Sequence, residues 1–225
     1  YEGANDFYSD SPARVAQVFA QALGAAGINA TLGEAGEPPA GAAALATVSS
    51  ATMGEQLRWM LAHSDNTLAD QYCRFAARAA GAPATYEGAT STVASTLSAA
   101  GVPTEGLFLE DCSGLSSNDR ISANTLVGVL KASYSGQGTS ADTMRLLPWA
   151  GLVGTLSKRM TEEPAVGNVQ AKTGALAEVS SLSGSVITRG GRVLLVSIGH
   201  DQVTAGALAT RGRLDAFEEG LAGLN

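Results

Sequence analysis

The sequence predicts an α+β fold in which an antiparallel sheet is flanked by helices, and two observations carry that prediction. Over about the first two thirds of the 225 residues, apolar side chains repeat at helical spacing between glycines, prolines and capping residues. In the last third, three short apolar stretches follow one another, and a Gly-Gly turn typical of a hairpin joins two of them. A run of helices followed by a run of strands is the element order of an α+β fold.

Each expected helix begins near a capping residue or a proline, or ends near a glycine or a break in the apolar repeat. We expect helices over about residues 11–24, 53–63, 68–79, 86–100, 123–134 and 206–221. Ser140 is expected to cap a further short helix that ends before Pro148. The first helix carries Val15, Val18 and Phe19 on one face, which predicts that it packs against the core.

We expect three strands, over residues 170–176, 179–188 and 193–199. Arg189-Gly190-Gly191 is the expected hairpin turn between the last two. Two weaker strand candidates precede them, Ala44-Leu-Ala-Thr-Val48 after a loop rich in glycine and proline, and Gly106-Leu-Phe-Leu109. Residues 149–160 are expected to be mostly loop and turn.

The composition is that of a single globular domain with an acidic surface. With 45% hydrophobic and 16% charged residues, the chain can bury a sizeable core. Its formal net charge of -7 repels a phosphate backbone, and it has no basic patch with interleaved aromatic residues, so nucleic acid is not an expected partner. The sequence has no basic-then-apolar leader and no apolar run as long as a membrane helix, so we expect a soluble, mature piece of a protein.

Cys73 and Cys112 are the two cysteines of the chain. Neither belongs to a Cys-x-x-Cys pair or to a Cys/His cluster with zinc spacing, so no structural metal is expected. In an oxidising compartment the two cysteines can form one disulfide, and two buried free thiols explain the sequence equally well.

The tripeptide Lys172-Thr173-Gly174 is where we expect the chemistry of the chain. It presents an ammonium, a hydroxyl and a bare backbone in an otherwise uncharged strand, which suits a bound carboxylate. The other lysines, Lys131 and Lys158, lie in segments typical of a solvated surface. His63 and His200 are expected to have no catalytic role, so a serine in this protein would need a lysine or a carboxylate as its base.

A Ser-x-Asn pattern is the expected companion of this lysine, because a hydroxyl can relay a proton and a carboxamide can both donate to and accept from a peptide. Three such patterns occur in the chain. Ser116-Ser-Asn118 is explained as a turn and Ser122-Ala-Asn124 as a helix cap. Ser64-Asp-Asn66 lies at the break between two amphipathic helices, where Ser64 and Asn66 can point together into a cleft.

Taken in order, these motifs resemble the penicillin-binding proteins of the D-alanyl-D-alanine carboxypeptidase/endopeptidase type, which are the penicillin-binding protein 4-like, class C low-molecular-mass enzymes. The resemblance runs nearly from end to end and implies a β-lactamase/transpeptidase-like fold. It rests on Ser64-Asp-Asn66 with Thr67-Leu-Ala-Asp70, Asp111-Cys-Ser-Gly-Leu-Ser116, Gly154-Thr-Leu156 with Arg159, Ala171-Lys-Thr-Gly174, and Ser181-Leu-Ser-Gly184 with its Gly-Gly hairpin.

One signature of that family, Ser-x-x-Lys, does not occur, because none of the three lysines has a serine three residues before it. In the family this segment supplies the acylated serine and its lysine base, upstream of inserted domains. The resemblance therefore implies that residues 1–225 are the C-terminal part of a penicillin-binding domain whose nucleophile segment and inserted domains lie outside this sequence. A natural homologue without catalytic activity is an alternative.

The family's reaction is acyl transfer from the penultimate D-alanine of a peptidoglycan stem peptide to the missing serine. The resemblance implies that Ser64 and Lys172 share in proton transfer to the leaving amine and that Asn66 holds the substrate amide. It also implies that Lys172 and Thr173 bind the terminal carboxylate.

Further residues follow from the same resemblance. Gly174 would allow the substrate to approach closely, and the backbone N–H of Ala175 would form half of the oxyanion hole. The sequence departs from the family where Ala175 replaces a threonine, Ser117 an arginine and Cys112 a glycine. These departures concern how the third residue of the stem peptide is recognised.

The surroundings of that third residue are the least determined part of the expected site. Leu115 and Leu176 are expected to line an apolar wall there. Asp111 and Ser113 either contact the substrate or form a hydrogen-bonded turn that shapes the cleft from outside. The expected partners are stem peptides, β-lactams and the missing N-terminal segment, with no cofactor, in the periplasm or cell-wall space of an exported protein. A β-lactamase, which carries the same motifs, is the second alternative.

Overall fold

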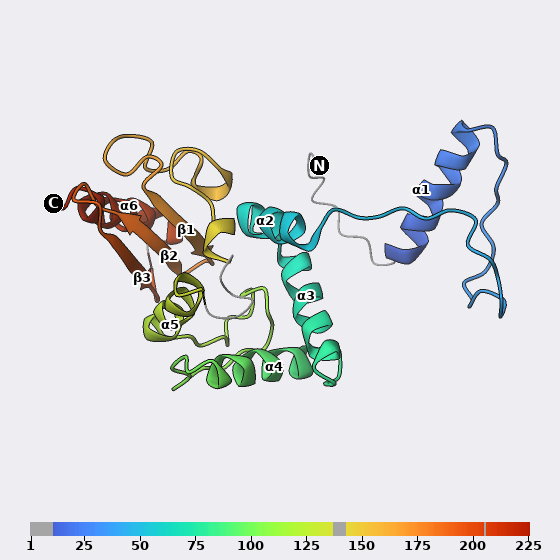
Figure 1. Ribbon diagram of the computed structural model, residues 1–225, viewed down its shortest axis with the longest axis horizontal. Helices are drawn as coiled ribbons and strands as arrows, with labels where there is room; N and C mark the ends of the chain where they lie inside the picture. The colour runs from blue at the N-terminus through green and yellow to red at the C-terminus, as the bar shows by residue number, and fades with distance from the viewer. Residues whose placement is uncertain (1–10, 137–142, 205) are drawn as a thin grey trace. The chain divides into compact units, whose positions relative to one another are not determined.

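The computed structural model describes residues 11–136, 143–204 and 206–225, and Figure 1 shows their helices and strands. Contacts between Cα atoms divide the chain into two compact units, Tyr1–Ser49 and Ser50–Asn225, whereas the composition predicted a single domain. The second unit contains the sheet and every candidate site residue. Each unit is described by itself.

The first unit has one described helix, α1 (Ser11–Ala25), where the sequence predicted it. Its apolar face is not buried as expected, since Val15 is 68% exposed and Phe19 64%. Residues 44–48 form no strand, and Leu45 is fully exposed. Both predictions were wrong for one reason: the residues between α1 and the next helix form no regular element against which a helix face or a strand edge could pack.

Four helices of the second unit precede the sheet, close to the predicted bounds: α2 (Met53–His63), α3 (Asn66–Ala79), α4 (Tyr86–Ala99) and α5 (Ala123–Tyr134). The side chains of Thr52, Asp65, Thr85 and Ser122 cap their first turns. The expected cap at Ser140 lies outside the described residues, and Met144–Leu146 beyond it forms a short 3₁₀ turn, η2.

Three antiparallel strands follow in the order β1-β2-β3, which confirms the α+β prediction: β1 (Val169–Ala175), β2 (Ser180–Ile187) and β3 (Val193–His200). In the predicted hairpin turn, the N–H of Gly191 bonds the carbonyl of Thr188 at 2.8 Å. The earlier strand candidate, residues 106–109, makes only an isolated bridge between Phe108 and Arg120. The bridge does not extend into a longer strand pair because the segment that contains Arg120 continues into α5 after Ser122.

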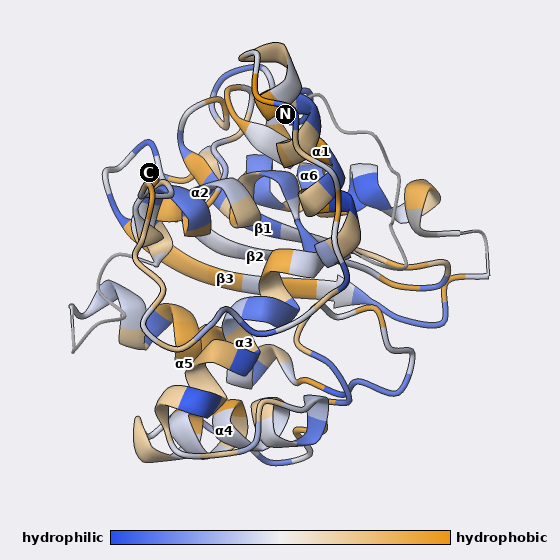
Figure 2. Ribbon diagram, turned by 90° about the vertical axis from the view of Figure 1, so that its right-hand side faces the viewer, coloured by the Kyte–Doolittle hydropathy of each residue, from blue (hydrophilic) through white to orange (hydrophobic). Residues whose placement is uncertain are grey.

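Helices cover both faces of the sheet (Figure 1). The last helix, α6 (Ala207–Ala222), packs on one face, and α5 packs on the other, against β3 and β2. The main core lies between the sheet and α6 and consists of Ala150, Leu156, Met160, Ala165, Val169, Ala171, Leu182, Val186, Val196, Leu214 and Ala222. On the α5 face a smaller cluster of Leu130, Met144 and Leu147 packs against Leu195 of β3. In Figure 2 the hydrophobic colour is strongest along β3, which serves both clusters.

Within the described ranges, no helix combines the length and the apolar character needed to cross a membrane. In the same ranges, no three His, Cys, Asp or Glu side chains are grouped closely enough to hold a metal ion.

Candidate active site

Ser64 lies at the break between α2 and α3. Its backbone is left-handed, with φ 54° and ψ 50°, and its N–H donates to the carbonyl of Met60, which ends α2. The next residue, Asp65, accepts a hydrogen bond of 2.9 Å from the N–H of Leu68 and starts α3. Because one helix ends and the next begins on adjacent residues, the Ser64 hydroxyl is held between two rigid elements.

Lys172 projects from the middle of β1 toward this break. Its Nζ donates to Ser64 Oγ at 2.7 Å and to the carbonyl oxygen of Thr173 at 2.6 Å. An apolar cavity of about 140 Å³, lined largely by α5 and η2, borders the side chain. Burial lowers the pKa of Lys172 from 10.5 to about 8, because the ammonium loses hydrating water. The structure thus brings together two predicted residues that are distant in the sequence and gives the lysine a pKa suited to proton transfer.

Lys172 also begins a polar row across the sheet. The strand register places Lys172 beside Ser183 of β2 and Ser183 beside Ser197 of β3. The two serine hydroxyls share a hydrogen bond of 2.9 Å. Ser183 belongs to the motif Ser181-Leu-Ser-Gly184, and no role was predicted for it. Its alternation with the buried Leu182 was the signal that it faces the lysine side.

Thr173 faces the opposite side of β1 from Lys172, as alternation along a strand requires. Its hydroxyl donates to Thr155 Oγ1 at 3.0 Å. Thr155 lies in η3 (Gly154–Leu156), a 3₁₀ turn within the segment predicted to be loop and turn. No role was predicted for Thr155, because only the folded chain brings η3 beside β1.

Gly174 lies opposite Ser181 of β2. A Cβ at Gly174 would lie 2.3 Å from Ser181 Oγ, so a side chain there would require the Ser181 hydroxyl to turn away. The close approach of a substrate to Gly174 stays a prediction.

The second half of β1 has an open outer edge. In the first half, the N–H of Ala171 bonds the carbonyl of Pro148 at 3.0 Å, and the N–H of Ala150 bonds the carbonyl of Val169 at 2.9 Å. The odd-numbered residues of β1 therefore direct their backbone groups away from β2, and the N–H of Ala175 follows the same alternation. Ala175 is exposed, so this N–H can bond an oxygen atom of a ligand.

Asn66 is the first residue of α3 and is half-buried, two residues after Ser64. No hydrogen bond of its carboxamide to another described residue is found. The structure therefore leaves this amide available for a ligand near the Ser64–Lys172 pair.

Asp111 organises the predicted turn at residues 111–116. Its carboxylate accepts hydrogen bonds from the N–H groups of Ser113 (2.7 Å), Gly114 (2.6 Å) and Ser116 (2.8 Å), and from the Ser113 hydroxyl (3.0 Å). Burial acts to raise the pKa of Asp111, but these hydrogen bonds outweigh it and the pKa is lowered. All of these bonds lie within the turn, so Asp111 and Ser113 shape this loop.

A disulfide ties the same loop to the helix that carries Asn66. Cys73 of α3 and Cys112 are bonded, with Cα atoms 6.3 Å apart, and the Cys112 N–H donates to Asp70 of α3 at 3.0 Å. The disulfide alternative is therefore the one that the structure adopts. Leu115 on this loop is 58% exposed. Leu176 is half-buried, and its N–H bonds Val179 in the turn after β1 at 2.9 Å.

The remaining lysines and histidines lie where the sequence predicted no chemistry. Lys131 and Lys158 are exposed. His63 is exposed and stacks on Trp59, with ring centroids 3.6 Å apart, and His200 is exposed at the end of β3.

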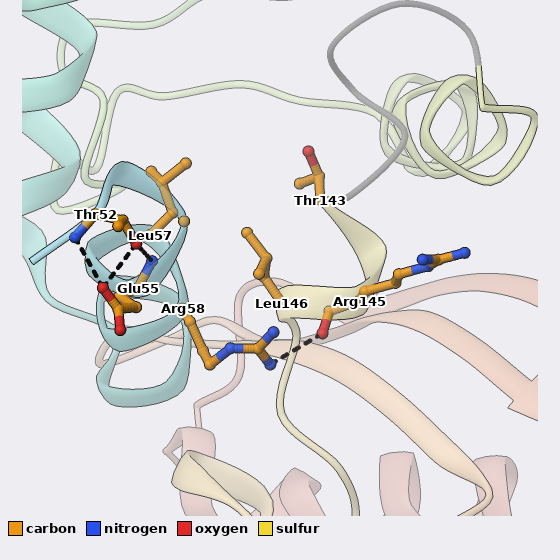
Figure 3. A pocket seen from close by; sticks show the side chains of 8 residues that line it. Thr52, Glu55, Leu57, Arg58, Thr143, Arg145 and Leu146 are labelled. Atoms are coloured by element: carbon orange, nitrogen blue, oxygen red, sulfur yellow. Dashed lines mark hydrogen bonds between the residues drawn. The ribbon is translucent and has the colours of Figure 1, made fainter.

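A hollow of about 590 Å³ lies between α2 and η2, and Figure 3 shows the side chains that line it, which include neither Ser64 nor Lys172. On α2 its lining extends from Thr52 at the cap to Arg58, whereas Ser64 follows the last turn, roughly 9 Å beyond Arg58 along the helix axis. Arg58 on its wall donates to the carbonyl of Arg145 at 3.2 Å, and Glu55 is engaged by Thr52 in the helix cap. The hydrogen bonds of Thr52 lower the pKa of Glu55, so the helix cap explains this shift, and we place the candidate site at Ser64 and Lys172.

The sheet, its two helical layers and the Ser64–Lys172 pair define the fold of a penicillin-binding protein. The structure superposes on the crystal structure of penicillin binding protein 4 (dacB) from Haemophilus influenzae, complexed with a β-lactam, with a TM-score of 0.77 and 27% sequence identity. The match covers 96% of this chain and 51% of that one. The expected β-lactamase/transpeptidase-like fold is confirmed.

The chain belongs to the D-Ala-D-Ala carboxypeptidase 3 (S13) family, whose profile matches residues 7–221. It is 39% identical over 196 residues to the carboxypeptidase DacB of Mycolicibacterium smegmatis, covering 84% of this chain and 42% of that protein. It is 35% identical over 188 residues to a D-alanyl-D-alanine carboxypeptidase of Actinomadura sp., covering 79% and 35%. The chain spans less than half the length of these relatives, and the family resemblance drawn from its motifs is confirmed.

Proposed function

We propose that this chain is part of a serine D,D-carboxypeptidase/endopeptidase that hydrolyses D-Ala-D-Ala or cross-bridge peptides of peptidoglycan and is acylated by penicillins. The observation that carries the proposal is the 2.7 Å contact between Lys172 Nζ and Ser64 Oγ in a chain of the S13 family. A lysine whose pKa is about 8, bonded to a hydroxyl, can exchange a proton near neutral pH.

The acylated serine belongs to a Ser-x-x-Lys segment outside residues 1–225. Its hydroxyl proton passes to the lysine of that segment as its oxygen attacks the carbonyl carbon of the penultimate D-alanine, and the C–N bond to the terminal D-alanine breaks. The Lys172 ammonium passes a proton through the Ser64 hydroxyl to the leaving amine. Water then attacks the acyl-enzyme, which releases the shortened peptide and restores the serine.

The terminal carboxylate of the substrate lies along the outer edge of β1. Lys172 and Thr173 project from opposite faces of this strand, so an anion at its edge meets an ammonium on one side and a hydroxyl on the other. The Asn66 carboxamide, which bonds no described residue, holds the substrate's amide. Gly174 keeps this edge free of a side chain.

The exposed N–H of Ala175 supplies one donor to the oxyanion of the tetrahedral intermediate, and the N–H of the acylated serine supplies the other. Removing one such donor costs about 2.7–4 kcal/mol in the transition state. Leu176 and Leu115 line the wall for the third residue of the stem peptide, with Asp111 and Ser113 holding the loop of Leu115 in shape.

The same serine is the site of acylation by β-lactams, whose strained amide takes the place of the peptide bond. The Haemophilus influenzae relative was solved with such a compound. A substrate in the cell wall places the whole protein outside the cytoplasm, in the periplasm or cell-wall space, and the disulfide between Cys73 and Cys112 agrees with an oxidising compartment.

The test uses the full-length protein that contains residues 1–225. We expect its gene to encode Ser-x-x-Lys upstream, a fluorescent penicillin to label that serine, and a pentapeptide ending in D-Ala-D-Ala to lose one D-alanine. Serine-to-alanine substitution in that motif is the matched control and should abolish both signals. A full-length protein with no such motif, or without label at saturating penicillin, contradicts the proposal and favours an inert peptidoglycan-binding homologue.

A further inference from the structure

The turn η3 is held between the helix that ends at Ser64 and the strand that carries Thr173. Gly154, at its start, has φ +63°. A Cβ on Gly154 would lie 2.4 Å from the carbonyl oxygen of Ala62, two residues before Ser64. Only glycine therefore allows this turn to rest against the backbone of α2.

The other end of η3 is anchored in the main core. Leu156 is fully buried there, and its carbonyl accepts a hydrogen bond of 3.0 Å from the N–H of Gly151. Three residues later, Arg159 binds Asp215 of α6 through two nitrogens, with Nε 3.1 Å from Oδ1. These contacts hold the backbone of Thr155 in place, and its hydroxyl oxygen lies 3.0 Å from that of Thr173.

The number of hydroxyl protons limits the hydrogen bonds that Thr155 and Thr173 can donate. Each hydroxyl has one proton, and in this structure the Thr173 proton is directed to Thr155. A carboxylate at the edge of β1 needs that proton. If the Thr173 hydroxyl turns to the carboxylate, Thr155 can donate to the oxygen that Thr173 then exposes. The result is a chain of two hydrogen bonds ending on the anion, in which each bond polarises the next.

We propose that Thr155 is a positioning residue for carboxylate recognition: it orients the Thr173 hydroxyl and strengthens it as a donor, so that the site selects ligands with a free C-terminal carboxylate. This inference rests on the proposed function. It assigns a specificity-determining role to a residue that lies outside the Ser-x-Asn and Lys-Thr-Gly motifs and does not itself touch the reacting carbonyl.

The test compares two thioester substrates of the full-length protein that differ in one group. Both carry the same acyl-D-alanyl part, and the leaving group bears a free carboxylate in one and its methyl ester in the other. Thr155→Val, which keeps the shape and removes the hydroxyl, should lower kcat/KM for the carboxylate substrate about tenfold, mainly through KM, as expected for one lost hydrogen bond. The methyl ester should be cleaved at the wild-type rate, and Thr155→Ser should restore selectivity.

An equal loss of kcat/KM on both substrates would show a merely structural role, and unchanged kcat/KM values on both would show no role; either result overturns the inference while the proposed function stands. A wild-type protein that cleaves neither thioester overturns the proposed function and this inference with it. If Thr155→Val does not fold, as judged by its thermal unfolding, Thr155→Ala makes the same comparison with a smaller side chain.

Discussion

Lys172 and Glu218 lie on opposite faces of the same sheet, and burial shifts the pKa of each toward neutrality from opposite directions. The pKa of Lys172 is lowered to about 8. Glu218 lies on α6 between the core residues Leu214 and Ala222 and is 1% exposed. Burial and the nearby Asp215 carboxylate raise the pKa of Glu218 to about 7, and Arg159 opposes them.

The two groups differ in their partners. Lys172 has two oxygen acceptors and lies near an open strand edge. Neither carboxylate oxygen of Glu218 has a hydrogen-bond partner among the described residues, and the nearby Arg159 is already bound to Asp215. The same physical cause thus yields a candidate catalytic group on one face and a destabilising group on the other. A shifted pKa indicates a functional site only where acceptors and ligand access accompany it.

The sharpest test of this contrast is to remove the Lys172 charge. In the full-length protein, Lys172→Met should slow acylation by penicillin about 1,000-fold, within the range of a lost general acid, with no loss of stability because a desolvated charge is removed. Acylation rates and thermal unfolding measure the two effects. The exposed Lys158→Met is the control, and a rate that drops equally in both variants would refute the role of Lys172.

Glu218→Gln should do the reverse, leaving acylation unchanged and altering stability. Because its pKa is raised in the folded state, Glu218 contributes stability that is full below about pH 4.5 and is lost as the pH rises through about 7. The difference corresponds to about 3 kcal/mol at pH 8. Denaturant unfolding at pH 4.5 and pH 8 should therefore show a larger free energy of unfolding for Glu218→Gln than for wild type only at pH 8. Glu219→Gln on the same helix is the control, and the prediction fails if both variants respond alike.

Substitutions of two serines beside Lys172 distinguish a residue of the proton relay from a residue of the polar row. Ser64→Ala should lower the rate of peptide hydrolysis about 100-fold, because the relay to the leaving amine is broken. Ser183→Ala should leave the rate nearly unchanged, since Ser183 bonds Ser197 rather than the lysine. Single-turnover release of D-alanine measures both variants, and equal losses would contradict the assignment of the relay to Ser64.

The smallest expected effect is on the pH profile. If the Lys172 ammonium donates the proton, kcat/KM should hold below about pH 8 and fall about tenfold per unit above it, because the pKa of Lys172 is lowered to about 8. The stability of the protein should be followed over the same range, to separate titration from unfolding. A rate that keeps rising well above pH 9 would show that neutral Lys172 acts as a base.

Much of this architecture follows from local sequence signals. The cap at Ser122 and the Gly-Gly hairpin were predicted because each satisfies backbone groups within a few residues. Local signals failed at α1 and at residues 44–48, where an apolar pattern predicted burial and the described residues of the first unit form no surface that covers it. The strand expected at residues 106–109 failed likewise, because a ladder depends on the partner segment as much as on its own residues.

The sequence by itself determined the element order, the chemical groups of Ser64, Asn66 and Lys172, and through its motifs the S13 family. Only the tertiary structure decided which of these groups meet. It places Lys172 on Ser64, directs Thr173 to Thr155, and leaves Glu218 without a hydrogen-bond partner among the described residues, because each outcome depends on strand register and on packing between segments far apart in the chain. Hydrogen bonding and desolvation act over a few ångströms of space, whatever the separation along the sequence.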